Sequence, residues 1–237
     1  MGDRTHTVVI TGGNRGLGKA IAERFVASGH RTAVLTRDGS APTGARGYTA
    51  DVADMASLQR ALDHVRDDLG AIDVAVANAG ITRDRRLTRM DEAEFAEVID
   101  VNLTGAFRLS RLVIDEMVKT GYGRIVFISS VGAVMPSFGQ VNYASSKAGL
   151  LGMARAIAGE YSHAGVTANV VAPGFVETDM TAALTPERRE AILARVPAAR
   201  AGTSEEIAAA VAWLAGPESG YITGAWIPVD GGVSMGH

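Results

Sequence analysis

Short strand-like runs alternate with longer amphipathic runs along most of this 237-residue chain. Seven of the runs have the residue types and length of strands: residues 6–11, 31–36, 47–52, 72–79, 124–130, 166–173 and 225–230. Helical patterns, such as residues 17–29 and 55–70, lie between most of them. Because this alternation favours a parallel sheet covered by helices on both faces, we predict an α/β fold in one doubly wound domain, residues 1–237.

The composition excludes several classes of function. The chain has no cysteine, which rules out thiol nucleophiles and thiolate metal sites and fits a cytoplasmic location; we expect no bound metal. A net charge of −3 argues against a general nucleic-acid binder. No run approaches the roughly 20 apolar residues of a membrane span, and the first residues lack a signal-peptide core. We therefore expect neither nucleic acid nor a membrane as a partner.

One long helix is predicted from residue 91 to about residue 119, and it carries two apolar stripes. The first comprises Phe95, Val98, Asn102, Ala106, Leu109, Val113 and Met117, and the second comprises Ile99, Leu103, Phe107 and Ile114. One stripe can pack against the sheet, whereas the second needs another surface to shield it from water. A partner subunit is the simplest cover and predicts an oligomer, and a long helix buried within a monomer is the alternative.

Four glycines, Gly12, Gly13, Gly16 and Gly18, separate the first predicted strand from the first predicted helix. Glycine permits a tight turn and lets backbone N–H groups approach a phosphate closely. The helix N-terminus behind the turn adds a favourable dipole. This position in a strand–turn–helix unit predicts a dinucleotide-binding site.

The glycine spacing, Thr11-Gly12-x-x-x-Gly16-x-Gly18, resembles that of the short-chain dehydrogenase/reductase family. The family's other marks follow in order over nearly the whole chain: Asp51-Val52, Asn78-Ala79-Gly80, Asn102, Ser130, Tyr143-x-x-x-Lys147 and Pro173-Gly174. The resemblance implies a Rossmann-like domain with a seven-stranded parallel sheet and a bound nicotinamide cofactor.

The same resemblance assigns cofactor contacts along the whole chain. They are Gly12, Asn14, Arg15, Gly16, Leu17, Gly18, Arg37, Asp51, Val52, Asn78, Ala79, Gly80, Tyr143, Lys147, Pro173, Gly174, Val176 and Thr178. Asp51 would contact the adenine amino group and Val52 would line that pocket. Asn78 would help to close the floor beside a ribose, although a turn former after a strand is its alternative role. Thr178 would bind the amide end of the cofactor, and it also suits a helix N-cap.

The end of the second predicted strand indicates which nicotinamide binds. NAD-specific sites usually place a carboxylate there, but this strand ends at Thr36-Arg37. A guanidinium can grip a 2′-phosphate with a planar fork of donors, and Arg15 lies where similar NADP-dependent proteins place a second base. We predict NADPH. Two alternatives stay open: a one-residue shift would bring Asp38 nearer, and both arginines could be ordinary surface residues.

Tyr143 and Lys147 lie four residues apart on a predicted helix and return to nearly the same face. Neighbours on a solvated face are one interpretation, and an acid with the charge that tunes it is the other. A phenol pKa near 10 would have to fall toward 7, which corresponds to about 4 kcal/mol, and a nearby ammonium acts in that direction. The resemblance adds hydrogen bonds from Lys147 to the nicotinamide ribose.

Ser130 and Asn102 complete the predicted catalytic set. Ser130 ends a strand 13 residues before Tyr143, which matches the family spacing, and its hydroxyl can polarise a carbonyl. Strand alternation turns its rival Ser129 to the opposite face. Asn102 is a poor helix former on an apolar stripe. In the family it loosens the helix so that the backbone holds a proton-relaying water, and a satisfied core amide is the alternative.

The catalytic set predicts carbonyl reduction, with hydride from NADPH and a proton from Tyr143. The stretches NVVAPGFVETDMT, DVNLTGAF, YASSKAG and ITGAWIPVDGG resemble bacterial 3-oxoacyl-[acyl-carrier-protein] reductases of fatty-acid elongation. That resemblance implies an acyl-carrier-bound 3-oxoacyl thioester as substrate, an (R)-3-hydroxyacyl product, a homotetramer and a substrate lid at residues 180–196. Polyketide ketoreductases and acetoacetyl-CoA reductases share the motifs, and a non-catalytic NADPH sensor is the non-enzyme alternative.

An acyl carrier protein is acidic, so its docking surface is expected to be basic. The candidates are Arg83, Arg85, Arg86, Arg89, Lys119 and Arg124. An ordinary solvated basic loop is the alternative for the first four.

Overall fold

The computed structural model describes residues 5–177 and 185–235. Seven parallel strands form one sheet in the order β3-β2-β1-β4-β5-β6-β7. Their bounds are β1 (Thr7–Thr11), β2 (Arg31–Thr36), β3 (Arg46–Thr49), β4 (Val74–Ala77), β5 (Gly123–Ile128), β6 (Val166–Pro173) and β7 (Trp226–Val229). Every predicted strand is present, and the predicted seven-stranded parallel sheet is confirmed.

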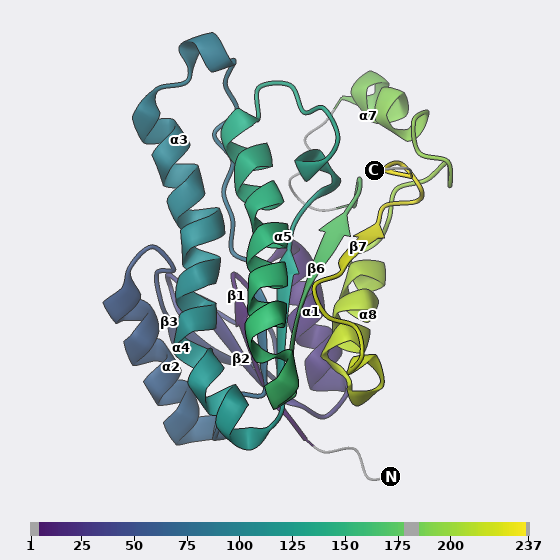
Figure 1. Cartoon of the computed structure of the whole chain (residues 1–237). Coiled ribbons are helices and arrows are strands. Elements are labelled where there is room, and N and C mark those ends of the chain that lie inside the picture. The colour runs from purple at the N-terminus through teal and green to yellow at the C-terminus, as the bar shows by residue number, and fades with distance from the viewer. Residues whose placement is uncertain (1–4, 178–184, 236–237) are drawn as a thin grey trace.

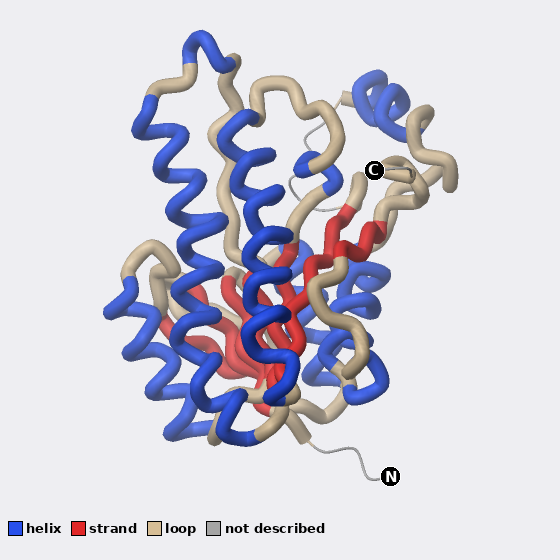
Figure 2. The backbone as a smooth tube through the Cα atoms, in the orientation of Figure 1, coloured by secondary structure: helices blue, strands red, loops and turns tan. Residues whose placement is uncertain are grey.

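Helices cover both faces of the sheet (Figures 1 and 2). The helices are α1 (Gly16–Ala27), α2 (Met55–Leu69), α3 (Glu92–Ile99), α4 (Gly105–Thr120), α5 (Val141–Tyr161), α7 (Pro186–Leu193) and α8 (Ser204–Ala215). Short 3₁₀ turns occupy Leu87–Arg89, Val131–Ala133, Ser162–Ala164 and Pro217–Ser219. Helices α2, α4 and α5 pack on one face and α1 and α8 on the other, which is the doubly wound arrangement.

The strands are apolar on both sides because both faces of the sheet are covered. In β1, Val9 belongs to the cluster with α2, α4 and α5, whereas Val8 and Ile10 belong to the cluster with α1 and α8. Local signals set the helix starts: Asp54 caps α2 by accepting two backbone N–H groups, and Thr203 forms a capping box with Glu206 at α8.

The long helix predicted over residues 91–119 is divided into three parts. A capping box between Asp91 and Glu94 starts α3. A π-helical segment, Asp100–Thr104, follows and leads into α4, which ends at the left-handed Gly121. A π turn inside an α-helix frequently marks a functional site, and this one contains Asn102.

The two stripes of that helix differ in burial. From Val98 to Met117 the first stripe is buried, as predicted, although Phe95 is 37% exposed. In the second stripe Phe107 is 49% exposed, but Ile114 is buried in the core, so the prediction that this whole stripe needs outside cover is wrong at that residue.

The strand order reverses between β1 and β4, which connect to neighbours on opposite sides of the sheet. A crevice opens at the carboxyl ends of the strands at such a point, where ligands of doubly wound sheets bind. The glycine turn follows β1 and Asn78 follows β4, so both lie at this edge. Among residues 5–177 and 185–235, no helix is long and apolar enough to cross a membrane.

Candidate active site

The glycine turn is built for a close backbone approach. Gly12 has φ +66°, and a Cβ on Gly18 would lie 2.2 Å from the Gly12 carbonyl oxygen, so only glycine fits there. Asn78 braces the turn, because its Nδ2 donates to the carbonyl oxygens of Thr11 (3.0 Å) and Gly12 (2.9 Å). Asn78 is therefore more than a turn former after a strand.

Thr11 begins the glycine motif, but the sequence prediction assigned it no role in the site. Its Oγ1 lies 3.1 Å from the backbone nitrogens of both Asn78 and Ala79 and accepts their N–H groups. One hydroxyl thus fixes the end of β4 against the end of β1. A threonine immediately before the first glycine of the turn was the available signal.

The start of α1 has the properties of an anion site. Arg15 occupies the N-cap without a side-chain cap, and the first turn carries no acidic residue, so the orphan N–H groups and the helix dipole favour an anion. Arg15 and Arg37 are both exposed. Asp38 stays ionised: hydrogen bonds, first from the Ser40 hydroxyl, lower its pKa to about 2.

Residues of the predicted adenine pocket follow β3. Asp51 is exposed, and its Oδ1 accepts the Ala53 N–H at 2.9 Å. Two residues of α4 contact Val52. Arg108 donates to the Val52 carbonyl oxygen at 3.1 Å, and a Cβ on Gly105 would lie 3.0 Å from the Val52 side chain. A side chain at position 105 would thus press against Val52.

Ser130, Tyr143 and Lys147 come together where β5 meets α5. Ser130 lies close enough to Tyr143 to act on the pKa of its phenol. The Lys147 ammonium lies 5.6 Å from the centroid of the Tyr143 ring and donates to the Ile128 carbonyl oxygen at 2.7 Å. Ser129 is turned away, since its hydroxyl donates to the Lys147 carbonyl oxygen at 2.8 Å. The choice of Ser130 over Ser129 agrees with this geometry.

The pKa of the Tyr143 phenol was expected to be lowered. In the protein without cofactor it is raised instead, so the expected direction is wrong. Burial raises the pKa of the phenol, the Ser130 hydrogen bond lowers it, and the Asp84 charge raises it again. Burial also lowers the pKa of Lys147 to about 8, from 10.5. At neutral pH the pair therefore consists of a protonated phenol and a largely charged amine, which is the state that a proton donor requires.

Asn102 is buried and fully hydrogen-bonded. Its Oδ1 accepts the Ile81 N–H at 2.8 Å, and its Nδ2 donates to the Ile81 carbonyl oxygen and to the Ser146 hydroxyl, both at 3.0 Å. A Cβ on Gly80 would lie 3.3 Å from Asn102 Oδ1 and 3.5 Å from Lys147 Nζ. Asn102 and Lys147 thus converge on Gly80, whose missing side chain leaves room between them.

Ser146 is a second residue that the sequence prediction missed. Its hydroxyl accepts from Asn102 Nδ2 and donates to the Tyr143 carbonyl oxygen at 2.7 Å, so it joins the π turn to α5. A small polar residue directly before the lysine of the Tyr-x-x-x-Lys motif was the only signal.

Buried Lys147 predicts an unusual pH dependence of stability. In the folded chain it releases its proton near pH 8 and in the unfolded chain near 10.5, so between these pH values the unfolded state binds more protons and stability rises with pH. We expect the free energy of unfolding of wild type minus that of Lys147→Met to rise by about 3 kcal/mol from pH 7 to pH 11. Urea unfolding measures it. Lys19→Met, at an exposed site, is the control with a flat difference, and a flat difference for Lys147→Met would contradict the burial argument.

The segment after β6 carries the remaining predicted contacts. A Cβ on Gly174 would lie 2.7 Å from Asp230 next to β7, and Val176 is buried in a bridge with Gly202. Pro173 ends β6 and is buried as well. Thr178, and residues 180–184 of the predicted lid, lie outside the described residues.

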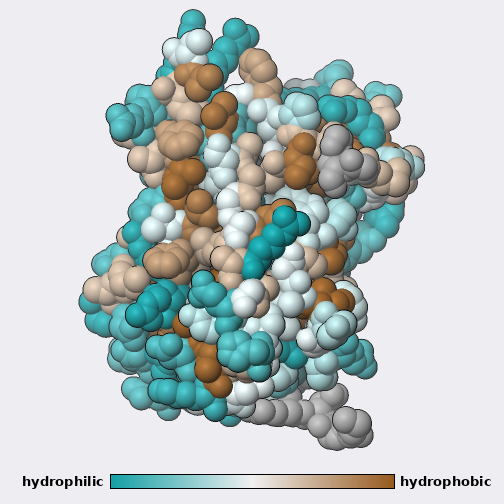
Figure 3. Space-filling model, viewed as in Figure 1, coloured by the Kyte–Doolittle hydropathy of each residue, from teal (hydrophilic) through white to brown (hydrophobic). Residues whose placement is uncertain are grey.

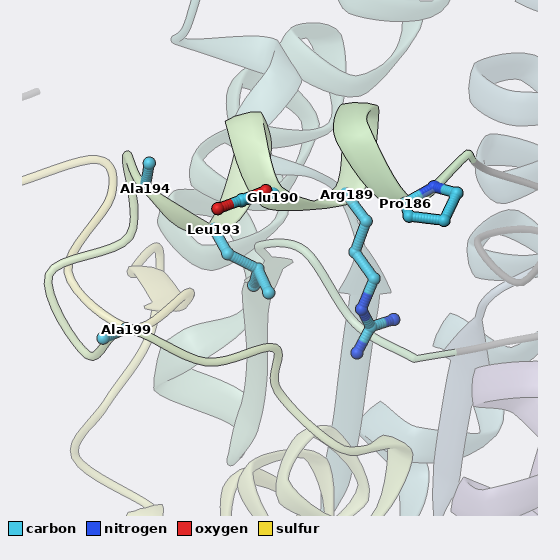
Figure 4. Close-up of a pocket in the computed structure, with 6 residues that line it drawn as sticks. All are labelled: Pro186, Arg189, Glu190, Leu193, Ala194 and Ala199. Carbon is cyan, nitrogen blue, oxygen red and sulfur yellow. The ribbon is translucent and has the colours of Figure 1, made fainter.

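The described part of the predicted lid segment contains α7, which lines a cavity of about 450 Å³ (Figure 4). Its lining residues are Pro186, Arg189, Glu190, Leu193, Ala194 and Ala199. Arg189 points beneath the helix, where it pairs with Glu177 and lies 5.9 Å from the centroid of the Phe175 ring. The lining includes none of Ser130, Tyr143 and Lys147, so this hollow lies beside α7 and apart from the predicted catalytic residues.

The predicted docking bases differ in their availability. Arg124 is buried, where it donates to backbone carbonyl oxygens and stacks on Tyr122, so its selection as a docking residue is wrong. Arg83 pairs with Glu97, and Arg85 pairs with Glu94 at 2.7 Å. Arg86 instead lies 5.2 Å from the centroid of the Phe138 ring, which is 81% exposed.

Comparison with known proteins agrees with the site. The family model described as enoyl-(acyl carrier protein) reductase, a short-chain dehydrogenase/reductase model, matches residues 12–234. The chain belongs to the short-chain dehydrogenase/reductase family. The family and the Rossmann-like fold that the motifs predicted are thereby confirmed.

Relatives within the short-chain dehydrogenase/reductase family are close over the full length. The 3-oxoacyl-[acyl-carrier-protein] reductase MabA of Mycobacterium avium is 48% identical over 233 residues, covering 98% of this chain and 91% of that protein. The FabG reductase of Escherichia coli K12 is 45% identical over 235 residues, covering 96% of each. A crystal structure from Agrobacterium tumefaciens, described provisionally as a gluconate dehydrogenase, has a TM-score of 0.90 at 32% identity and covers 96% of this chain and 95% of that one.

Proposed function

We propose that this chain is an NADPH-dependent oxidoreductase that converts a carrier-bound 3-oxoacyl thioester into the (R)-3-hydroxyacyl form in fatty-acid biosynthesis. The observation that carries the proposal is the identity of 45–48% over nearly the whole chain with proteins named 3-oxoacyl-[acyl-carrier-protein] reductase. The family description names an enoyl reductase, but whole-length identity to individual relatives is the more specific guide to substrate. A cytoplasmic location fits the cysteine-free chain.

The residues after β1 and β2 fit a phosphorylated dinucleotide. The glycine turn excludes side chains where Gly18 meets Gly12, and the adjoining start of α1 favours an anion. Arg15 and Arg37 would hold a 2′-phosphate. Asp38 is the carboxylate that could favour NAD instead. It accepts a hydrogen bond from the Ser40 hydroxyl, which in turn accepts one from Asn14, so these residues occupy the Asp38 side chain. The predicted contacts at Leu17, Asp51 and Thr178 remain proposals.

Each catalytic side chain has a distinct task in this mechanism. NADPH, when bound, supplies hydride to the carbonyl carbon. Ser130 donates a hydrogen bond that orients the carbonyl oxygen, and Tyr143 gives its proton to that oxygen as negative charge develops. Lys147 stabilises the phenolate that is left, because a nearby cation favours the charged form. The π-helical segment that contains Asn102 would hold a water that passes a proton to Lys147, and this proton would restore the Tyr143 phenol.

Removing the Arg37 guanidinium tests the cofactor assignment. Arg37→Ala is expected to raise KM for NADPH by at least about tenfold and to change KM for NADH less than about twofold, since one charge-assisted hydrogen bond contributes about 1.5–3 kcal/mol. Arg31→Ala, at an exposed residue at the opposite end of β2, should change neither. Equal or better kcat/KM with NADH in the wild type would contradict the assignment.

The proposed quaternary state is a homotetramer. Hydrophobic residues gather on the face formed by α3, α4 and α5 (Figure 3). Among them, Phe95, Phe107, Val118 and Val141 are 36–49% exposed. A second subunit on this face would supply the cover that the described residues do not.

Arg86 is the proposed contact for the acidic carrier. We expect Arg86→Glu to raise KM for acetoacetyl-[acyl-carrier protein] about fivefold and to leave a free 3-keto ester unaffected, because a charge at the rim of an interface acts through about 1 kcal/mol. Arg60→Glu, at an exposed residue of α2, makes the same charge change elsewhere and should have no effect. Equal changes for both substrates would contradict docking at Arg86.

A comparison of substrates distinguishes the proposed activity from the alternative reductase activities. Rates with acetoacetyl-[acyl-carrier protein], acetoacetyl-CoA and a cyclic ketone are measured side by side with NADPH. The proposal expects the highest kcat/KM for the carrier thioester. Preference for CoA would favour an acetoacetyl-CoA reductase, and preference for the cyclic ketone a ketoreductase of secondary metabolism.

A further inference from the structure

Asn142, immediately before Tyr143, is fully buried although it is polar. It is the second residue of α5, and the first N–H groups of a helix have no partner within the helix. Gln140 occupies the N-cap but makes no side-chain cap. Instead, Oδ1 of Asn142 accepts the backbone N–H of Tyr143 at 2.7 Å.

The other end of the same amide reaches two further elements. Its Nδ2 donates to the carbonyl oxygen of Arg83 at 3.0 Å and toward that of Glu94 at 3.5 Å. One side chain therefore ties the backbone of Tyr143 to the loop after β4 and to the first turn of α3.

Neighbouring contacts reinforce this connection. The Arg85 N–H donates to the Gly139 carbonyl oxygen at 2.8 Å, and Gln140 donates to the Asp84 carboxylate at 3.0 Å. The ion pairs of Arg83 and Arg85 with α3 hold the loop from its other side. The loop of residues 83–85 thus braces the start of α5.

We propose that Asn142 is a positioning residue for Tyr143, holding its backbone so that the phenol meets Ser130 and Lys147. This inference rests on the proposed function, in which Tyr143 is the proton donor. A misplacement of about 1 Å can lower a rate by about 10²-fold, and no other described side chain accepts the Tyr143 N–H.

The test separates positioning from a general loss of stability. Asn169 is the matched control, because it is 1% exposed, accepts the Ala225 N–H and donates to the Ile222 carbonyl oxygen. Asn142→Leu and Asn169→Leu are assayed with NADPH and an acetoacetyl thioester, well below both melting temperatures. Both should lose stability, but only Asn142→Leu should lose kcat, by about 100-fold, with KM for NADPH within threefold of wild type.

A conservative variant sharpens the result. The hydroxyl of Asn142→Ser can still accept the Tyr143 N–H, so kcat should recover at least tenfold relative to Asn142→Leu. If Asn142→Leu does not fold, Asn142→Ala, which also lacks an acceptor for the Tyr143 N–H, takes its place, and Asn169→Ala is then the matched control for the comparison of kcat with stability. Equal losses of kcat at positions 142 and 169, or no recovery with serine, would overturn the proposal.

Tyr143→Phe is measured in parallel. A Tyr143→Phe enzyme with near-normal kcat would refute the proposed acid itself. An inactive Tyr143→Phe beside a fully active Asn142→Leu would refute only the positioning role.

Discussion

Tyr143→Phe is expected to lower kcat for 3-oxoacyl reduction by about 10³-fold while leaving NADPH affinity nearly unchanged. General acid catalysis contributes about 10²–10⁴-fold, and the variant removes only the hydroxyl. The ring that packs beside the Lys147 ammonium remains. Single-turnover kinetics with saturating NADPH measure the loss.

Stability provides the control for that variant. The variant removes a single hydroxyl, and one hydrogen bond contributes about 1 kcal/mol, so the free energy of unfolding should fall by only about that much. Turnover within a few-fold of wild type would contradict the role of Tyr143 as proton donor. So would a loss of activity that merely follows a loss of folded protein.

Gly18→Ala is expected to have the largest effect on cofactor binding. The added Cβ would lie 2.2 Å from the Gly12 carbonyl oxygen and 2.5 Å from Asn78 Nδ2, so backbone must move and the brace on the turn must break. Overpacking of this kind lowers stability by about 3 kcal/mol. Losing one or two charge-assisted hydrogen bonds weakens NADPH binding by roughly 100-fold.

Gly29→Ala is the matched control for Gly18→Ala. Gly29 has φ +78°, but a Cβ there meets nothing within 4 Å, so only the left-handed backbone is strained, by about 1 kcal/mol. NADPH titration and urea unfolding of both variants give the comparison. Similar losses of NADPH affinity in the two proteins would contradict the argument that the turn requires close backbone approach.

The sheet could be predicted because its strands are short, β-branched and separated by helical patterns. The candidate site could be predicted because the family resemblance assigns roles to Gly12, Asn78 and Ser130, which lie at or directly after the ends of the first, fourth and fifth predicted strands. Asn102 stood out for a physical reason: an amide on an apolar stripe breaks a local rule. The structure accounts for this with the π-helical segment that the residue occupies.

Tertiary contacts account for what the sequence could not supply. Arg124 looked like a surface base, yet it is buried and donates hydrogen bonds to the carbonyl oxygens of Gly123 and Gly165. The charge of Lys147 was expected to lower the pKa of Tyr143, but the largest effect on that pKa is burial, which raises it and depends on the whole fold. Asn142 showed no signal because its partners are 59 and 48 residues distant along the chain.

The most direct test of the proposed activity follows NADPH consumption and product configuration together. Wild-type protein is incubated with NADPH and acetoacetyl-[acyl-carrier protein], and the acyl product is released and resolved on a chiral phase. The proposal predicts one NADPH consumed per (R)-3-hydroxybutyryl group formed. NADPH that binds but is not consumed with any 3-oxoacyl thioester, or a product of (S) configuration, would contradict it.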